Sequence, residues 1–388
     1  MSIPTTSSVA DDVEIVRRIF AHIDAGTTDE GDAWREPVEN YLDPIRFTKE
    51  LEVLRSYPSV FLPSAAIPQA GDHAERVTSG VPLFAVRDHD GHARVFRNSC
   101  RHRGMALVEG PGCTHALVCR YHGWTYRLDG TLSHVPHAEA FPGLDMPARG
   151  LVEVESREVD GLIVIGPLDA PDPRRADAAM AALADGSPWR DKLLPADRLF
   201  TVRPALREMN WKVLVEQFLE GYHIRTTHKN TFYPIQYDDL NVIEAFGPNT
   251  RITFPYQNIE RLRDRPESTW NAGHRVTYVY HLFPNVMVAT FPNQVLVITI
   301  DPIDIDHTTV TIYAMVTPDV AKRVSANPED VTGPRNLLNE GGVEDNEMSE
   351  GVQRGLHAGA NTFVEFGRHE SAIGRFHATL DERLAHTR

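Results

Sequence analysis

The stretch Asn210–His228, NWKVLVEQFLEGYHIRTTH, decides how this chain is organised. At about 100° per residue its apolar side chains gather on one arc of a helix, and Glu220 and His223 fall outside that arc. The segment therefore packs one face into a core and turns acid and imidazole groups elsewhere. His228 lies five residues after His223. The two rings converge only if the helix distorts or ends between them, and Gly221 favours such a break.

Two imidazoles and one carboxylate form the ligand set of a non-haem ferrous site, which leaves further metal positions open. The segment GGVEDNEMSEGVQRGL supplies two candidate carboxylates, Glu344 and Asp345. On a helix, Asp345 lies near the centre of the apolar arc, and Glu344 lies about 100° away. An inward-facing carboxylate needs a cation to offset its desolvation, so we expect Asp345 to be the third ligand. The alternatives are two surface histidines and an acidic first turn of a helix.

A second motif lies in the N-terminal half of the chain. Cys100 and His102 are followed, after 16 intervening residues, by Cys119 and His122. Each Cys–His pair is expected on its own loop between short strands, so four ligands can close on one inorganic centre. Such a ligand set holds either a structural zinc ion or a [2Fe–2S] cluster. Cys113 falls outside the pattern and is expected to be a small packing residue.

The order of elements predicts an α+β protein. Helical spacing is found from about 11 to 24 and near 43 to 57, and short strands with Asp-Gly turns begin at about residue 82. Long β-runs then follow one another without a helical crossover, and the last 50 residues return to helix. This order indicates an antiparallel sheet with helices on one face. The expected long strands are 276–282, 285–290, 294–300 and 308–315.

Composition narrows the class of protein. The 388 residues allow one large or two ordinary domains, and 41% hydrophobic with 24% charged residues is typical of a soluble globular protein. The net charge of −15 argues against a nucleic-acid partner, and three cysteines exclude a disulfide scaffold. No apolar run reaches the length of a membrane span, and the start lacks a signal-peptide pattern. We therefore expect a cytoplasmic protein that binds no membrane.

Both motifs together resemble the oxygenase α-subunits of the Rieske non-haem iron oxygenases, the aromatic-ring-hydroxylating type. The resemblance runs from about residue 45 to the C-terminus and includes CRHRG, YHGWTY, NWKVLVEQFLEGYH and FGRHESAIGRFHATLDERL. It implies a helical segment over 1–57, a Rieske β-domain over 58–165 and a helix-grip catalytic domain over 166–388. It also implies two metal centres: a [2Fe–2S] cluster on Cys100, His102, Cys119 and His122, and a mononuclear Fe(II) on His223, His228 and Asp345.

The resemblance extends to two further residues. Glu220 stands where most of the family has aspartate, and it would accept N–H groups from a Rieske imidazole and an iron imidazole. Asn210 would lie near the iron, with a helix N-cap as the alternative role.

The family implies an oxygenase that activates O2 to hydroxylate a small organic substrate. Electrons would come from NAD(P)H through a separate reductase, directly or through a ferredoxin, and the chains would form homotrimers. An aromatic acid is the first substrate hypothesis, and a quaternary ammonium compound held by cation–π contacts is the second. Two other classes are a Rieske electron carrier, which needs only the cluster domain, and an inactive homologue, which would lack a ligand. The long C-terminal part and the complete ligand set argue against both.

Overall fold

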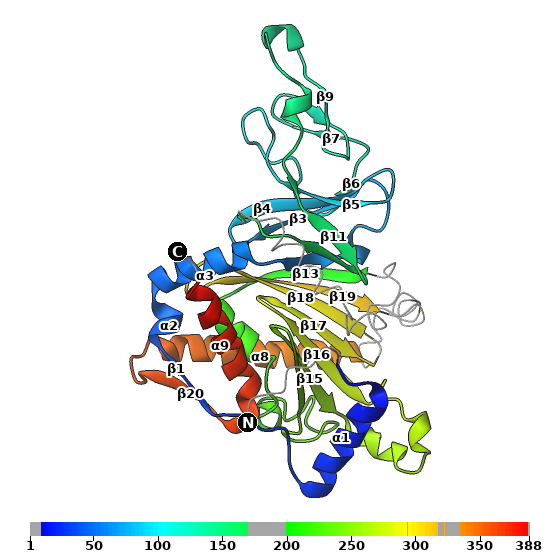
Figure 1. The fold of residues 1–388 in the computed structure, drawn as a ribbon, viewed down its shortest axis with the longest axis vertical. Coiled ribbons are helices and arrows are strands. Elements are labelled where there is room, and N and C mark those ends of the chain that lie inside the picture. Colours follow the sequence, from blue (N-terminus) through cyan, green and yellow to red (C-terminus); the bar gives the residue numbers. More distant parts are fainter. Residues whose placement is uncertain (1–8, 170–198, 293, 317–321, 323–333, 387–388) are drawn as a thin grey trace. The chain divides into compact units, whose positions relative to one another are not determined.

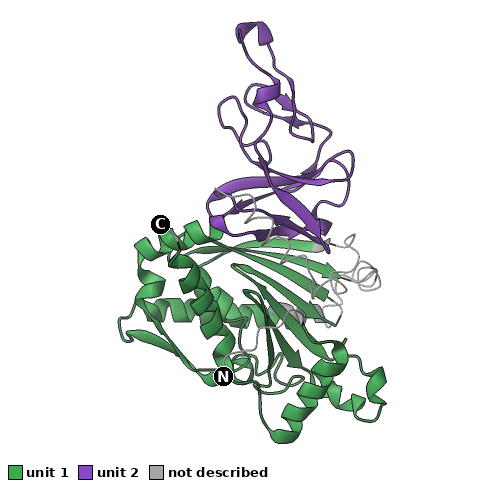
Figure 2. Ribbon diagram, in the orientation of Figure 1, with its two compact units in different colours: residues 1–54, 200–388 green, residues 55–199 purple. Residues whose placement is uncertain are grey.

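The structure is a computed structural model that describes residues 9–169, 199–292, 294–316, 322 and 334–386 (Figure 1). The chain divides into two compact units (Figure 2). We call residues 55–199 the small unit, and residues 1–54 with 200–388 the large unit. None of the described helices is long and apolar enough to cross a membrane.

The small unit consists of short antiparallel strands. Its described residues form three sheets, in the orders β10-β5-β4-β3-β6, β11-β12-β2 and β7-β8-β9. The expected hairpin at Asp90–Gly91 is confirmed, because this turn joins β4 to β5. The strands are β2 (Ser59–Pro63), β3 (Asp72–Thr78), β4 (Val81–Arg87), β5 (Ala93–Arg97), β6 (Gly112–Cys113), β7 (Leu117–Val118), β8 (Thr125–Tyr126), β9 (Leu132–His134), β10 (Glu153–Val154), β11 (Ser156–Val159) and β12 (Leu162–Ile165).

An antiparallel sheet dominates the large unit. Among the described residues it has seven strands, in the order β13-β19-β18-β17-β16-β15-β14. The four expected long strands are confirmed as β16 to β19, whereas β13, β14 and β15 lie in stretches without a clear sequence pattern. The strands are β13 (Leu199–Arg207), β14 (Val242–Phe246), β15 (Asn249–Pro255), β16 (Val276–Leu282), β17 (Val286–Phe291), β18 (Gln294–Pro302) and β19 (Thr308–Val316).

The two faces of this sheet have different neighbours. On β16, His281 points to the helical face, where its ring lies 5.4 Å from that of Phe376 in α9 (Ser371–Leu384). Tyr278, an odd number of positions away, points to the opposite face, where its hydroxyl donates to Asp12 of α1 (Asp12–Ala25). Because successive side chains of a strand point to opposite faces, only every second residue of β16 faces the helices on the His281 side. The helices on the His281 side are α9, α5 (Trp211–Glu216), which contacts β18, and α8 (Pro334–Leu356), which contacts α5 (Figure 1).

The N-terminal segment, expected as a separate piece over 1–57, belongs to the large unit as far as residue 54. Its strand β1 (Trp34–Pro37) pairs antiparallel with β20 (Phe363–Phe366) near the C-terminus. Its helix α3 (Pro44–Ser56) was expected from the sequence and carries Glu50, which is fully buried against Lys212 of α5. Pairing between distant segments, which local spacing cannot reveal, joins this segment to the C-terminal part of the chain. The remaining piece is α2 (Glu39–Leu42).

Candidate metal centres

Two loops of the small unit have the same backbone geometry. In the first, Cys100 N–H donates to the carbonyl of Met105, and Gly104 N–H donates to the carbonyl of Cys100. In the second loop, Cys119 N–H donates to the carbonyl of Trp124, and Gly123 N–H donates to the carbonyl of Cys119. Each glycine has a left-handed φ, +81° at Gly104 and +71° at Gly123, which other residues rarely adopt. A glycine four residues after each cysteine is thus a second sequence signal for these loops, beside the Cys–His spacing.

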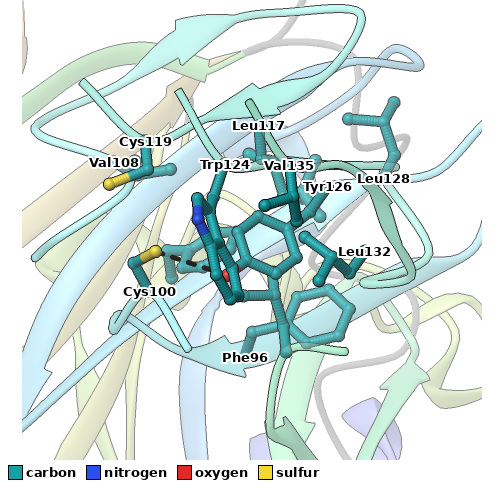
Figure 3. Close-up of a cluster of buried hydrophobic side chains, with 13 residues drawn as sticks. Phe96, Cys100, Val108, Leu117, Cys119, Trp124, Tyr126, Leu128, Leu132 and Val135 are labelled. Carbon is teal, nitrogen blue, oxygen red and sulfur yellow. Dashed lines mark hydrogen bonds between the residues drawn. The ribbon is translucent and has the colours of Figure 1, made fainter. Parts of the chain in front are cut away.

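Both loops direct their cysteines inward and their histidines outward. Cys100 and Cys119 are buried among apolar side chains (Figure 3), and their thiols interact with each other. His102 and His122 lie nearer the surface with their ring centroids 4.6 Å apart. His102 stacks on Trp124 at 4.9 Å, and His122 stacks on the exposed Tyr121 at 3.8 Å. The sequence-predicted residues are therefore brought together as one sulfur pair and one nitrogen pair.

This donor set fits a [2Fe–2S] cluster with two thiolates on one iron and two imidazoles on the other. Burial raises the pKa of the Cys100 thiol, and the Tyr126 hydroxyl, which lies 3.3 Å from the sulfur, opposes that effect (Figure 3). A bound metal cation would supply the positive charge that stabilises a buried thiolate anion. Cys113, outside the pair, is exposed on β6 rather than packed, so its expected role as a packing residue is wrong.

In the large unit the motif helix is interrupted before the first histidine. α5 ends at Glu216, and a single turn, α6 (Ile224–Thr227), has His223 at its N-cap and His228 at its C-cap. The intervening Gly221 has no room for a Cβ, which would lie 2.4 Å from Asn241 Oδ1. A break near Gly221 was expected, although it was expected to fall between the histidines. The two rings converge because His228 leaves the helical conformation at the end of the short turn.

His223, His228 and Asp345 meet at one point, where their donor atoms all lie within 4.8 Å of one another. Asp345 Oδ1 lies 2.9 Å from His228 Nε2 and 3.6 Å from His223 Nε2. His228 is 2% exposed, whereas His223 and Asp345 keep about a fifth of their surface. This set of two imidazoles and one carboxylate, open on one side, fits a mononuclear iron ion.

A carboxylate holds each of these imidazoles from behind. Glu220 accepts from His223 Nδ1 and, at 3.1 Å, from the His223 backbone N–H. His228 Nδ1 donates to Glu344 at 2.8 Å, and Thr231 donates to the same Glu344 oxygen at 2.7 Å. The remaining ring nitrogens, both Nε2, are thereby left to face Asp345. Glu344 was considered only as the rival to Asp345, but it occupies the outer position behind His228.

The field at His223 is strongly negative. Burial by itself lowers the pKa of the His223 imidazole. The negative charges of Glu220 and then Asp345 outweigh burial and raise this pKa from 6.5 to about 9. The charges that hold a proton on this ring are the charges that would attract a metal cation to it.

A cavity of about 210 Å³ opens beside this cluster. Its acidic lining comprises Glu216, Glu220, Asp345 and Glu370, and its apolar lining includes Phe366 and Met348, without a lysine or arginine among the lining residues. The remaining lining residues are Val213, Gln217, His223, Thr227, Ser349, Val352, Val364 and Ile373. Gln217, which no sequence motif indicated, accepts from Ser349 at 2.5 Å, and its own N–H donors have no hydrogen-bond partner among the described residues.

Asn210 caps α5 and does not line the cavity. Its Oδ1 accepts from Lys212 N–H at 3.0 Å, and its Nδ2 donates to the carbonyls of Tyr41 and Ile305. The side chain is fully buried, so every polar atom is used in holding the start of the helix. The capping role, which the sequence left as the alternative, is the one that the structure shows. Asn210 is therefore not retained as a catalytic candidate.

The sequence matches two protein families along its length. It matches the Rieske [2Fe-2S] domain over residues 59–151 and the ring hydroxylating alpha subunit (catalytic domain) over residues 185–386. The chain belongs to the ring-hydroxylating α-subunit family of Rieske oxygenases. The zinc alternative for the cysteine loops and the cluster-only carrier are set aside by these two matches together.

Individual relatives differ in chemistry. The chain is 30% identical over 211 residues to the carnitine monooxygenase oxygenase subunit of Escherichia coli (strain K12), covering 53% of this chain and 55% of that protein. It is 32% identical over 197 residues to the biphenyl 2,3-dioxygenase subunit alpha of Rhodococcus jostii (strain RHA1), covering 48% and 42%. The chain thus aligns with about half the length of these relatives. A crystal structure of a quaternary ammonium Rieske monooxygenase shares the fold, with a TM-score of 0.73, 21% identity, and 92% and 96% coverage.

Proposed function

We propose that this chain is the oxygenase component of a Rieske system that hydroxylates a small substrate with O2 and reductase-supplied electrons. The observation that carries the proposal is the convergence of His223, His228 and Asp345, with both outer ring nitrogens already held by carboxylates. These residues would hold a ferrous ion, which supplies O2 activation when bound. The protein orients the ligands and shields the site. Cys100, Cys119, His102 and His122 would hold the cluster that delivers the electrons.

Metal analysis and spectroscopy test this assignment. The purified protein is expected to contain labile sulfide and about three irons, a pair in the cluster and one in the mononuclear site. Reduction should give the EPR signal of a histidine-ligated [2Fe–2S] cluster. A colourless protein with stoichiometric zinc in the cysteine loops would overturn it.

The substrate that best fits the cavity is a small cation of the quaternary ammonium or amine class. An aromatic acid, the first hypothesis from the sequence, would bring a carboxylate beside Glu220 and Glu370, the two lining carboxylates that are neither proposed iron ligands nor paired with His377, and like charges in a partly dry site repel. The negative field is visible at Glu370, whose pKa is raised by burial and by the neighbouring Glu220. Phe366 adds an aromatic ring, which favours a cation further. The match to carnitine monooxygenase supports the same class.

An isosteric pair of compounds separates charge from shape. Choline and its uncharged analogue 3,3-dimethylbutan-1-ol differ only in the nitrogen, so stimulation of coupled O2 uptake by choline alone would support a cation site. Benzoate and a neutral arene complete the panel. Coupled turnover with either of them, and none with ammonium compounds, would replace the cation proposal by the aromatic one.

Electron delivery is proposed to cross between subunits of a homotrimer. His122 and Tyr121 lie exposed at the tip of their loop, and Glu220 uses one lone pair of each oxygen on His223. Glu220 can therefore accept a further N–H group, and His122 of a neighbouring copy would supply it. Head-to-tail contacts of this kind close into a ring.

Mixed assembly tests this route. Cys100→Ser removes a cluster ligand and His223→Ala removes an iron ligand, so each variant alone is expected to be inactive. Co-assembled trimers should regain part of the turnover, because some interfaces would join an intact cluster to an intact iron site. Stable mixed trimers without any recovery would mean that electrons stay within one chain.

A further inference from the structure

A buried histidine that belongs to neither metal centre lies behind the cavity. His377 of α9 is 0% exposed and lies between two carboxylates from different parts of the chain. Its Nε2 donates to Glu216 Oε1 at 2.8 Å, and its Nδ1 lies 3.4 Å from Glu36 Oε1. Glu216 is at the end of α5 and lines the cavity, whereas Glu36 is on β1 and is 1% exposed. A charged histidine thus connects the cavity wall to an acid behind it.

The groups around this histidine are arranged to keep it protonated. Burial alone lowers the pKa of His377, but Glu216 and Glu36 outweigh burial and raise it to about 9. Glu36 has its pKa lowered to about 2 despite burial, chiefly by His377. From α2, the Tyr41 hydroxyl donates to the same Glu216 oxygen at 2.7 Å. From α3, Arg46 lies 4.0 Å from Glu36.

A second buried histidine, His281, shows that burial beside Phe376 does not by itself keep an imidazole protonated. His281 contacts the same ring, Phe376, and is 1% exposed. Within the part of the chain that the structure describes, its hydrogen-bond partner is the backbone carbonyl of Pro284 at 3.1 Å, and burial lowers its pKa to about 4. At neutral pH the protein therefore keeps one of these two histidines charged and the other uncharged. A buried ion triad is seldom worth its desolvation for stability alone.

We propose that His377 and Glu216 form a proton-delivery pair for the chemistry in the cavity. The inference rests on the proposed oxygenase function. Inserting one oxygen atom of O2 into a C–H bond, with the other leaving as water, consumes a pair of electrons and a pair of protons. The electrons come from the cluster. The N–H bond at His377 Nε2 breaks, the proton moves to Glu216 Oε1, and Glu216 releases it into the cavity, where it ends in water. His377 keeps its Nδ1 proton, facing Glu36, and regains a proton at Nε2 from cavity water through Glu216 before the next turnover.

The first test reads the protonation state directly, without turnover. In the full-length protein labelled with 15N-histidine, the buried imidazolium signal that disappears in His377→Gln should persist above pH 8 in the wild type. Glu216→Gln keeps the hydrogen bond but not the charge, so it should shift that titration to lower pH. A wild-type His377 that titrates below pH 6.5 would overturn the proposal, even in a protein that shows no oxygenase activity.

The second test reads the use of protons. Glu216→Gln and His377→Gln should lower product formation by roughly 10²-fold, in the range that a positioned proton donor contributes. They should retain both metal centres, release more hydrogen peroxide per electron, and lose the solvent isotope effect on product formation. His281→Asn is the matched control, with equal burial and the same ring contact, and it should leave coupling and isotope effect unchanged. If Glu216→Gln folds with both metal centres and keeps normal coupling, the pair is structural and the proposal is wrong.

Discussion

The two histidine pairs of this protein are held in opposite ways. His223 and His228 are each backed by a carboxylate, Glu220 and Glu344, at the nitrogen turned away from the site. His102 and His122 have no carboxylate partner among the described residues and instead stack on Trp124 and Tyr121. Carboxylates fix the tautomer and strengthen the metal bond, whereas ring contacts fix orientation and leave the outer nitrogen free. The first pair is complete within its own unit, and the second is open to an external acceptor.

The largest expected effects come from deleting a ligand of either the mononuclear iron site or the cluster. Asp345→Ala should remove about one iron and all turnover while leaving the cluster spectrum intact, because it deletes a ligand of only one centre. Cys100→Ser should do the reverse. Iron analysis combined with EPR of each variant checks this, and a cluster spectrum lost in Asp345→Ala would show that the centres are not independent.

Replacing a carboxylate behind an iron histidine by glutamine, which has the same size, tests the role of its charge. Glu344→Gln should weaken iron binding by about 10- to 100-fold, since the amide no longer offers an anionic acceptor to His228. Glu220→Gln should weaken iron binding to a similar degree and should, in addition, slow electron transfer in the iron-loaded protein, because Glu220 is also the proposed acceptor for His122. Metal titration and single-turnover kinetics distinguish the two variants. Equal electron-transfer rates in the two iron-loaded variants would assign Glu220 no role beyond holding His223.

His377, a histidine held by carboxylates but not a metal ligand, is expected to make the stability of the folded chain depend on pH. His377 has its pKa raised to about 9 in the folded chain, from an ordinary value of 6.5. Its contribution is therefore fully present below pH 6.5 and is lost as pH rises through 9, by about 3 kcal/mol. Urea unfolding of the wild type between pH 6.5 and 9.5 should show this fall. The fall should shrink in Glu216→Gln, and an unchanged slope in that variant would contradict the assignment.

The smallest effect tests a residue that belongs to neither pair. Asn210→Ala should destabilise the large unit by about 2 kcal/mol through loss of the helix cap and its hydrogen bonds. Iron content should be unchanged, because Asn210 does not line the cavity. Urea unfolding and iron analysis of the same preparation suffice. Loss of iron without loss of stability would return Asn210 to the list of site residues.

The sequence by itself determined the parts of this protein that depend on local spacing. Cys100, His102, Cys119 and His122 could be named because a cluster motif fixes both residue type and separation within one pair of loops. The long strands β16 to β19 followed from their continuous apolar runs, and Asp345 followed from its place on a helical arc. Each of these rests on side chains that are neighbours along the chain or one turn apart.

Only the tertiary structure decided relations between distant segments. It placed Asp345 beside both histidines and Glu344 behind His228, and it turned Tyr278 away from the helical face of the sheet. It used Oδ1 of Asn210 to cap α5 and its Nδ2 to bond two distant carbonyls. It also brought Glu36 from the N-terminal segment to 3.4 Å from Nδ1 of His377 in the last helix. Hydrogen bonds and charge interactions depend on distance in space, and sequence separation carries no information about that distance once the chain has packed.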